Sequence, residues 1–110
     1  VWAFEWPEAV PTFIGHKQVT ALVAKPDLSM DLGGMIVCIP NADPGFDWLF
    51  AHPIAGLITA WGGPNSHMAI RAGELGIPAV IGTGEVLYRR FSGAKRLHVD
   101  CSNQRVEVLT

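Results

Sequence analysis

Residues 62–82, GGPNSHMAIRAGELGIPAVIG, contain the clearest succession of turn, helix and strand in the sequence. Four apolar side chains recur at helical spacing within residues 66–75 and would form one buried face: Met68, Ala69, Ala72 and Leu75. Asn65 or Ser66 can cap this helix with a side-chain oxygen that accepts from a free backbone N–H, and Gly76 is typical of a helix end. The run at 77–82 then predicts a strand, so the whole stretch indicates an α/β fold.

The rest of the chain alternates short apolar runs with turn residues. Strands are predicted where apolar or β-branched residues cluster between turns, at residues 17–24, 35–39, 55–60, 95–100 and 105–110. Helical segments are expected at 46–51 and 84–91, and turns or loops at 31–34, 40–45 and 102–104. These elements do not form a regular βαβ series, so the prediction is a compact α/β domain and not a doubly wound sheet.

The composition fits one compact domain. The chain has 110 residues, of which 49% are hydrophobic, so it can bury a core of its own. Eight basic and ten acidic residues give a net charge of -2 without a basic run, which argues against a nucleic-acid-binding protein. Because no apolar stretch would span a membrane and no signal peptide is evident, we expect no membrane partner and a cytoplasmic location.

The first residues raise a question of domain organisation. Residues 1–14 are interpreted as a linker or leader segment, and residues 15–110 as the folded domain. The alternating Trp2, Phe4 and Trp6 would cover either the core of this domain or the surface of a neighbouring one. Since the chain begins with Val and not Met, we expect it to come from a longer or processed protein.

The cysteines point to neither a disulfide framework nor a metal site. Cys38 lies in the apolar run 35–39 and is expected to be a small buried side chain. His98 and Cys101 are three residues apart and could supply half of a metal site, but no second pair completes it. No metal ligands are therefore predicted in this domain.

One histidine stands where chemistry is expected. His67 begins the predicted helix, whose first turn leaves N–H groups unpaired and attracts anions. Gly62 and Gly63 carry no side chains, so a ligand can approach the backbone closely. A neutral imidazole is a competent nucleophile, and a phosphoryl group on it would lie beside the helix N-terminus. From the residues alone, an incidental histidine after a tight turn is an equally open interpretation.

The spacing around His67 follows a fixed pattern: T-x-x-G-G-x-x-S-H-x-A-I at Thr59–Ile70, then A-x-x-x-G-I-P-A-V at Ala72–Val80. This pattern resembles that of a known family, the phosphohistidine swivelling domain of phosphoenolpyruvate-utilising enzymes. The resemblance is weaker over the rest of residues 15–110, where it includes GMIVCIPNADPGFDWLF. Pyruvate phosphate dikinase and phosphoenolpyruvate synthase, both phosphotransferases, belong to that family.

The resemblance implies a swivelling β/β/α fold of packed β-sheets with short flanking helices, and a phosphoryl carrier in which His67 is the catalytic residue. Four residues are expected to bind or support the phosphate: Thr59, Gly62, Gly63 and Ser66. The implied partners are a nucleotide-binding domain and a phosphoenolpyruvate- or pyruvate-binding domain of a parent chain or complex. No cofactor is expected in this domain, whereas the parent enzyme could use magnesium and a nucleotide.

The sequence departs from the family pattern at the helix. The family usually has an arginine where Gly73 stands, and this chain has Arg71 instead. Arg71 lies four residues after His67 on the same helix face, so it can reach a phosphate there or stay solvated. Asp47 and Trp48 are carried as residues adjacent to the site, because the loop of the family at this place lies near the histidine.

Two alternatives to the carrier remain. The apolar Ala60 and Trp61, together with Gly73, allow a regulatory or docking module of the same fold in which His67 is unused. A hydrolase with His67 as base is a third interpretation, but the sequence offers it no nucleophile partner. The remaining histidines, His16, His52 and His98, are expected to be ordinary surface or core residues.

Overall fold

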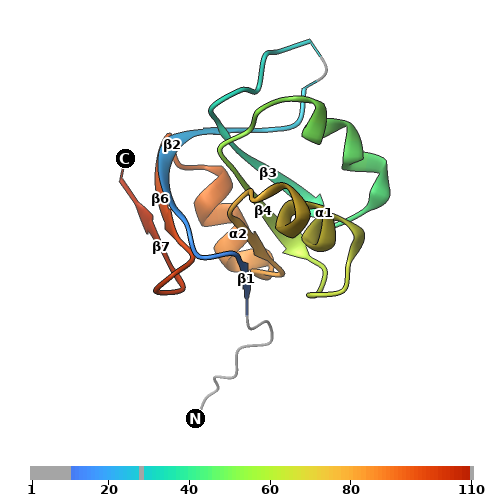
Figure 1. Ribbon diagram of the computed structural model, residues 1–110. Coiled ribbons are helices and arrows are strands. Elements are labelled where there is room, and N and C mark those ends of the chain that lie inside the picture. The colour runs from blue at the N-terminus through green and yellow to red at the C-terminus, as the bar shows by residue number, and fades with distance from the viewer. Residues whose placement is uncertain (1–10, 28, 110) are drawn as a thin grey trace.

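The structure, a computed structural model, describes residues 11–27 and 29–109 (Figure 1). Its strands are β1 (Thr12–Ile14), β2 (Gln18–Ala24), β3 (Ile36–Asn41), β4 (Gly56–Trp61), β5 (Ala79–Ile81), β6 (Arg96–Asp100) and β7 (Arg105–Val108). Its helices are the 3-10 helix η1 (Pro44–Ala51) and the α-helices α1 (His67–Leu75) and α2 (Glu85–Ser92). The chain thus has the α/β class that the sequence predicts.

The strands form one mixed sheet with a parallel centre. The seven strands follow the order β1-β5-β4-β3-β2-β6-β7. β2, β3, β4 and β5 are parallel neighbours, while β1 pairs antiparallel with β5 at one edge and β6 and β7 continue antiparallel beyond β2. The parallel strands lie side by side in chain order, which the irregular spacing of the elements did not reveal.

The two faces of the sheet bury two separate hydrophobic clusters. Successive residues of β3 alternate between them, since side chains along a strand point to opposite faces. Val37 packs with the cluster beneath η1 and α1, and Cys38 with the cluster beneath α2. Burial of one such large apolar side chain stabilises the fold by about 1.5–3 kcal/mol. The helices therefore lie on opposite faces of the sheet.

Helix α1 has the predicted extent and end, but Leu75, predicted on its buried face, is the last helical residue and is 47% exposed. The helix spans His67–Leu75, and Gly76 follows in the left-handed conformation with φ 72°. The N–H of Ile77 then donates to the carbonyl of Ala72 at 2.9 Å, which closes the helix end. This end turns the chain directly into β5.

The structure differs most from the predictions around residues 40–45. Residues 40–45 were expected to form a loop, but β3 continues to Asn41 and η1 already begins at Pro44. The carboxylate of Asp43 accepts from the N–H of Gly45 at 2.8 Å, and proline suits the first helical position, so this turn-rich segment starts a helix. η1 is accordingly longer than the single turn expected at 46–51.

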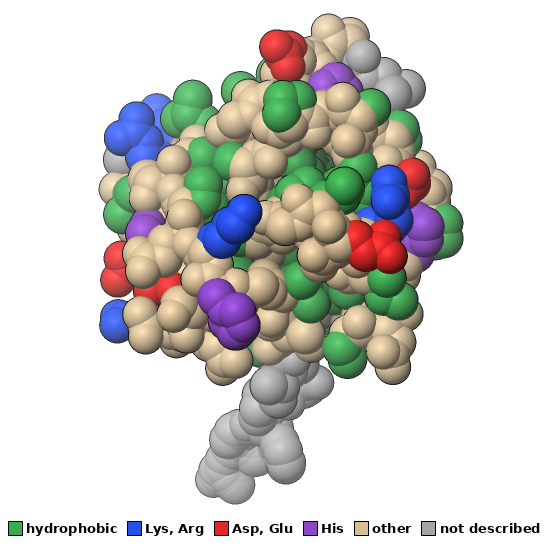
Figure 2. All heavy atoms as spheres, in the orientation of Figure 1, with side chains coloured by type: hydrophobic (Ala, Val, Ile, Leu, Met, Phe, Trp, Pro, Cys, Tyr) green, Lys and Arg blue, Asp and Glu red, His purple; other side chains and the backbone are tan. Residues whose placement is uncertain are grey.

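One face of the molecule carries both charge signs without concentrating either (Figure 2). On the face shown in Figure 2, basic and acidic side chains are dispersed among hydrophobic and uncharged ones.

β1 lies before residue 15, where we expect the domain to begin, and pairs with β5. The interpretation of Trp2, Phe4 and Trp6 falls outside the described residues. Within the described residues, no helix has the length and hydropathy that a membrane crossing requires.

Candidate functional site

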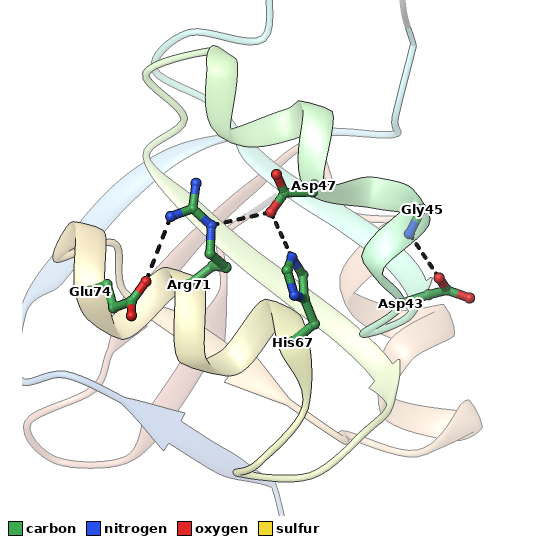
Figure 3. A network of polar contacts seen from close by, with 6 residues as sticks. All are labelled: Asp43, Gly45, Asp47, His67, Arg71 and Glu74. Carbon is green, nitrogen blue, oxygen red and sulfur yellow. Dashed lines mark hydrogen bonds and ion pairs between the residues drawn. The ribbon is translucent and has the colours of Figure 1, made fainter.

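His67 is the first residue of α1 and faces η1 across a short gap (Figure 3). Its Nε2 atom lies 2.7 Å from the Oδ1 atom of Asp47, a residue of η1. The two side chains are 37% and 43% exposed, so the imidazole is held in place yet remains open to solvent. A residue that sequence reasoning placed only near the site is therefore in direct contact with His67.

Arg71 shares the same carboxylate oxygen. Its Nε atom donates to Asp47 Oδ1 at 3.2 Å, one helical turn after His67. The guanidinium also lies 3.6 Å from Glu74 and 5.7 Å from the centre of the Phe50 ring. A hydrogen bond from His67, with a smaller contribution from Arg71, lowers the pKa of Asp47 and favours its charged form. The site thus contains a cation and an anion beside the imidazole.

Ser66 occupies the cap position of α1 but does not cap it through its hydroxyl. Its backbone is extended, as expected for a cap residue, and its Oγ donates to the carbonyl of Gly63 at 2.6 Å. The expected bond from a helix N–H to this side chain is absent among the described residues, because the preceding turn uses the hydroxyl instead. The first-turn N–H groups of α1 are therefore not used by the serine side chain.

The paired glycines have different surroundings. Gly62 has φ +130°, and a Cβ atom there would lie 2.6 Å from the Cβ of Ala42. A Cβ on Gly63 would meet no atom within 4 Å. Gly62 is therefore required by packing and backbone conformation, whereas Gly63 leaves open space before the helix.

Thr59 is fully buried at the end of β4, and its hydroxyl connects backbone groups. It donates to the carbonyl of Trp61 at 3.0 Å and accepts from the N–H of Gly82 at 3.1 Å. In this structure, those partners and not His67 bind the hydroxyl. The contact with the imidazole or its phosphate that the resemblance implies stays a prediction.

The other histidines lie apart from this arrangement. His98 is in β6, where its Nδ1 atom lies 2.7 Å from the hydroxyl of Thr20. His52 follows η1 and contacts the ring of Trp48 edge-on at 6.2 Å between centroids. No group of three or more His, Cys, Asp or Glu side chains within residues 11–27 and 29–109 could hold a metal ion.

The sequence signal for the site was uneven. The glycine turn and helix start identify His67, and the four-residue spacing identifies Arg71. Asp47 lies 20 residues before His67, and only the packing of η1 against α1 brings the two together. Phe50, one helical turn further along η1, was not predicted, since it carries no motif.

Comparison with known proteins supports the resemblance. The family model described as PEP-utilising enzyme, mobile domain, matches residues 32–104, which include His67 and Asp47. Rifampicin phosphotransferase from Streptomyces sviceus is 34% identical over 104 residues, which cover 94% of this chain and 11% of that protein. Phosphoenolpyruvate synthase from Aeropyrum pernix is 38% identical over 80 residues, or 72% of this chain and 9% of that protein.

A third relative and a solved structure extend these findings. Phosphoenolpyruvate synthase from Aquifex aeolicus is 40% identical over 73 residues, which cover 63% of this chain and 8% of that protein. The solution structure of a UPF0107 protein superposes with a TM-score of 0.66 at 14% identity, covering 92% of this chain and all of that one, so it shares the fold. The chain spans about a tenth of the length of these curated relatives. Because this family model matches most of the chain and a relative is 34% identical over 94% of it, this chain belongs to the family of mobile domains of PEP-utilising enzymes.

Proposed function

We propose that His67 is the phosphoryl-carrying residue of this mobile domain. The observation that carries the proposal is the place of its side chain, which is partly exposed and belongs to the first residue of α1, where the Ser66 hydroxyl leaves the first-turn N–H groups unused. A phosphoryl group is an anion that such a helix end stabilises. The match to the mobile-domain family supports the same role.

The transfer needs only a ring nitrogen with a free lone pair. This nitrogen attacks phosphorus, the N–P bond forms, and the bond between phosphorus and the leaving group of the donor breaks with its electron pair going to that group. In the second step an acceptor atom attacks phosphorus and the N–P bond breaks. Catalysis by the carrier is mainly positioning, because the same histidine must meet two partners in turn.

Neighbouring groups would hold the phosphoryl group. Gly63 leaves space beside the helix start, and Arg71 offers a permanent positive charge on the face of His67. Thr59 and Ser66 would join only if their hydroxyls left their present backbone partners. Gly62 would contribute through the shape of the turn.

The donor and acceptor would be bound by other domains. The relatives are named phosphoenolpyruvate synthase and rifampicin phosphotransferase, so we propose one domain for a nucleotide and one for phosphoenolpyruvate or an acceptor. Magnesium and nucleotide, where the parent enzyme uses them, would bind there and not in this domain. This chain would then be one part of a phosphotransferase, unable to complete the reaction alone.

The proposal is tested by chemical phosphorylation. The chain is treated with phosphoramidate, kept alkaline, and mapped by peptide mass spectrometry. We expect an acid-labile phosphoryl group mainly on His67, because the open helix end and Arg71 favour an anion there. His16, His52 and His98 serve as internal controls, and His67→Ala should lose the signal.

A second arm tests transfer within the parent protein. His67→Ala there should abolish phosphoryl transfer while each substrate still binds to its own domain. Equal labelling of all four histidines, together with full transfer by His67→Ala, would contradict the carrier. The docking module would then be the better interpretation of this fold.

A further inference from the structure

The carboxylate of Asp47 stands at the outer nitrogen of His67. Oδ1 lies 2.7 Å from Nε2, and Figure 3 shows the imidazole directed toward η1. An ionised carboxylate only accepts hydrogen bonds, so the Nε2 atom must carry the proton in this contact. A neutral imidazole protonated at Nε2 has its lone pair at Nδ1, and Nε2 cannot then attack phosphorus.

The same carboxylate oxygen also neutralises Arg71. Arg71 Nε donates to Oδ1 at 3.2 Å, so one oxygen is shared between the imidazole and the guanidinium. An anion that replaced this carboxylate would find both groups within reach. A phosphoryl group on Nε2 would be such an anion, and it would repel the carboxylate from its present place.

We propose that Asp47 masks Nε2 of His67 in the empty carrier and that Arg71 exchanges Asp47 for the phosphoryl group when the carrier is loaded. This inference rests on the proposed function of His67. The order of events follows from the contacts. Asp47 withdraws, and the proton moves from Nε2 to Nδ1 through solvent. The Nε2 lone pair then forms the N–P bond while the leaving group departs with its electron pair.

The exchange makes Asp47 a residue that controls which nitrogen reacts. While Asp47 is in place, only Nδ1 is available to a small phosphoryl donor. Without its carboxylate, Nε2 is unmasked, and Arg71 is free to attract the incoming anion. The half-exposed position of Asp47 allows the side chain to be removed or displaced without opening the core.

The test measures which nitrogen is phosphorylated. Wild-type chain, Asp47→Ala and Asp47→Asn are treated with phosphoramidate, and the two phosphohistidine isomers are followed by ³¹P NMR after subtraction of the His67→Ala spectrum. We expect the initial rate at Nε2 to rise by roughly threefold or more in Asp47→Ala, as for loss of an exposed charged contact. The Nε2 rate of Asp47→Asn should lie between the rates of the wild type and Asp47→Ala, because the amide oxygen still accepts a hydrogen bond but carries no charge.

The matched control is Glu74→Ala. Glu74 also pairs with Arg71, at 3.6 Å, and removing it deletes one negative charge without touching the imidazole contact. It should leave the isomer ratio near that of the wild type. The exchange would be overturned if the rate of phosphorylation at Nε2 rose equally in Asp47→Ala and Glu74→Ala. It would also be overturned if this rate were unchanged or lower in Asp47→Ala. Circular dichroism confirms that each variant is folded.

This measurement separates the inference from the proposed function. Phosphoramidate labels the imidazole chemically, so the isomer ratio reports the masking even if no parent domain delivers a phosphoryl group to His67. Transfer that depends on His67 in the parent protein, combined with an unchanged isomer ratio, would support the carrier and overturn the masking by Asp47.

Discussion

Gly62 and Gly63 are neighbours with different physical roles. Gly62 adopts φ +130° and has the Cβ of Ala42 close to where its own Cβ would be, whereas Gly63 faces open space. The sequence identifies both only as glycines of a turn. Only Gly62 is needed by the fold, because it contacts Ala42 in the loop after β3. This contact joins residues far apart in the sequence, so no local pattern predicts it.

Substitution by alanine should affect stability at Gly62 but hardly at Gly63. Gly62→Ala should lower the free energy of unfolding by about 1–3 kcal/mol, because it adds both backbone strain and overlap. Gly63→Ala should change it by no more than about 0.5 kcal/mol. Urea unfolding of both variants measures the difference, and equal losses would mean that the turn is not packed as described.

Gly63→Ala also tests the space before the helix. If the phosphoryl group uses that space, this variant should keep its stability and yet lose part of its labelling at His67. The same peptide mapping with phosphoramidate measures the loss, with wild type as reference. Unchanged labelling would place the phosphoryl group elsewhere around the imidazole.

At the scale of elements, α1 depends on packing more than on propensity. It has nine residues, with a glycine at position 73 in its interior, and its buried face consists of Met68, Ala69 and Ala72. An isolated helix of this length is marginal in water, so contacts with the sheet and η1 hold it. Its apolar spacing was nevertheless enough to predict its extent within one residue.

Gly73→Ala should stabilise the domain. A Cβ atom there would lie 3.5 Å from the Cγ2 of Ile14, an ordinary contact, and the position has no positive φ. Alanine restricts the unfolded chain and favours the helix, so we expect a gain of about 0.5–1 kcal/mol in the free energy of unfolding. Thermal unfolding measures it, and a loss would show that β1 cannot accept the extra methyl group.

Two elements were predicted incompletely: β1 was not expected as a strand, and η1 was expected to be shorter. β1 has three residues and is a strand only because β5, more than sixty residues later, pairs with it. η1 was predicted too short, because Pro44 and Gly45 are typical loop residues. The capping side chain of Asp43 makes them the start of the helix instead. The long alternating or helical runs carry their own pattern, whereas β1 depends on a distant partner strand and η1 begins at a local side-chain cap.

Over the whole molecule, one of the two clusters, the one beneath α2, buries both cysteines. Cys38 is fully buried in the middle of β3, and burial raises its pKa to about 12. Cys101 is 3% exposed, and burial raises its pKa as well. The reactive thiolate forms are thus disfavoured while the sheet is intact.

Alkylation should therefore report opening of the whole domain. At pH 8 we expect iodoacetamide to modify both thiols at least about a thousandfold more slowly in the native chain than in urea, if the unfolding free energy is about 5 kcal/mol. Mass spectrometry follows the reaction, with the fully unfolded chain as control. Rapid modification of Cys101 alone would indicate local opening at the β6–β7 turn.

The loops that follow β4 and β5 pack closely against each other. A Cβ on Gly82 would lie 2.6 Å from the carbonyl oxygen of Gly62, and the hydroxyl of Thr59 joins the same two loops by hydrogen bonds. The loop around Gly62, which precedes His67, is therefore packed against the loop around Gly82 and does not move independently of the sheet. Under the carrier role proposed for His67, the imidazole would therefore move between its partners together with the whole domain and not with this loop alone.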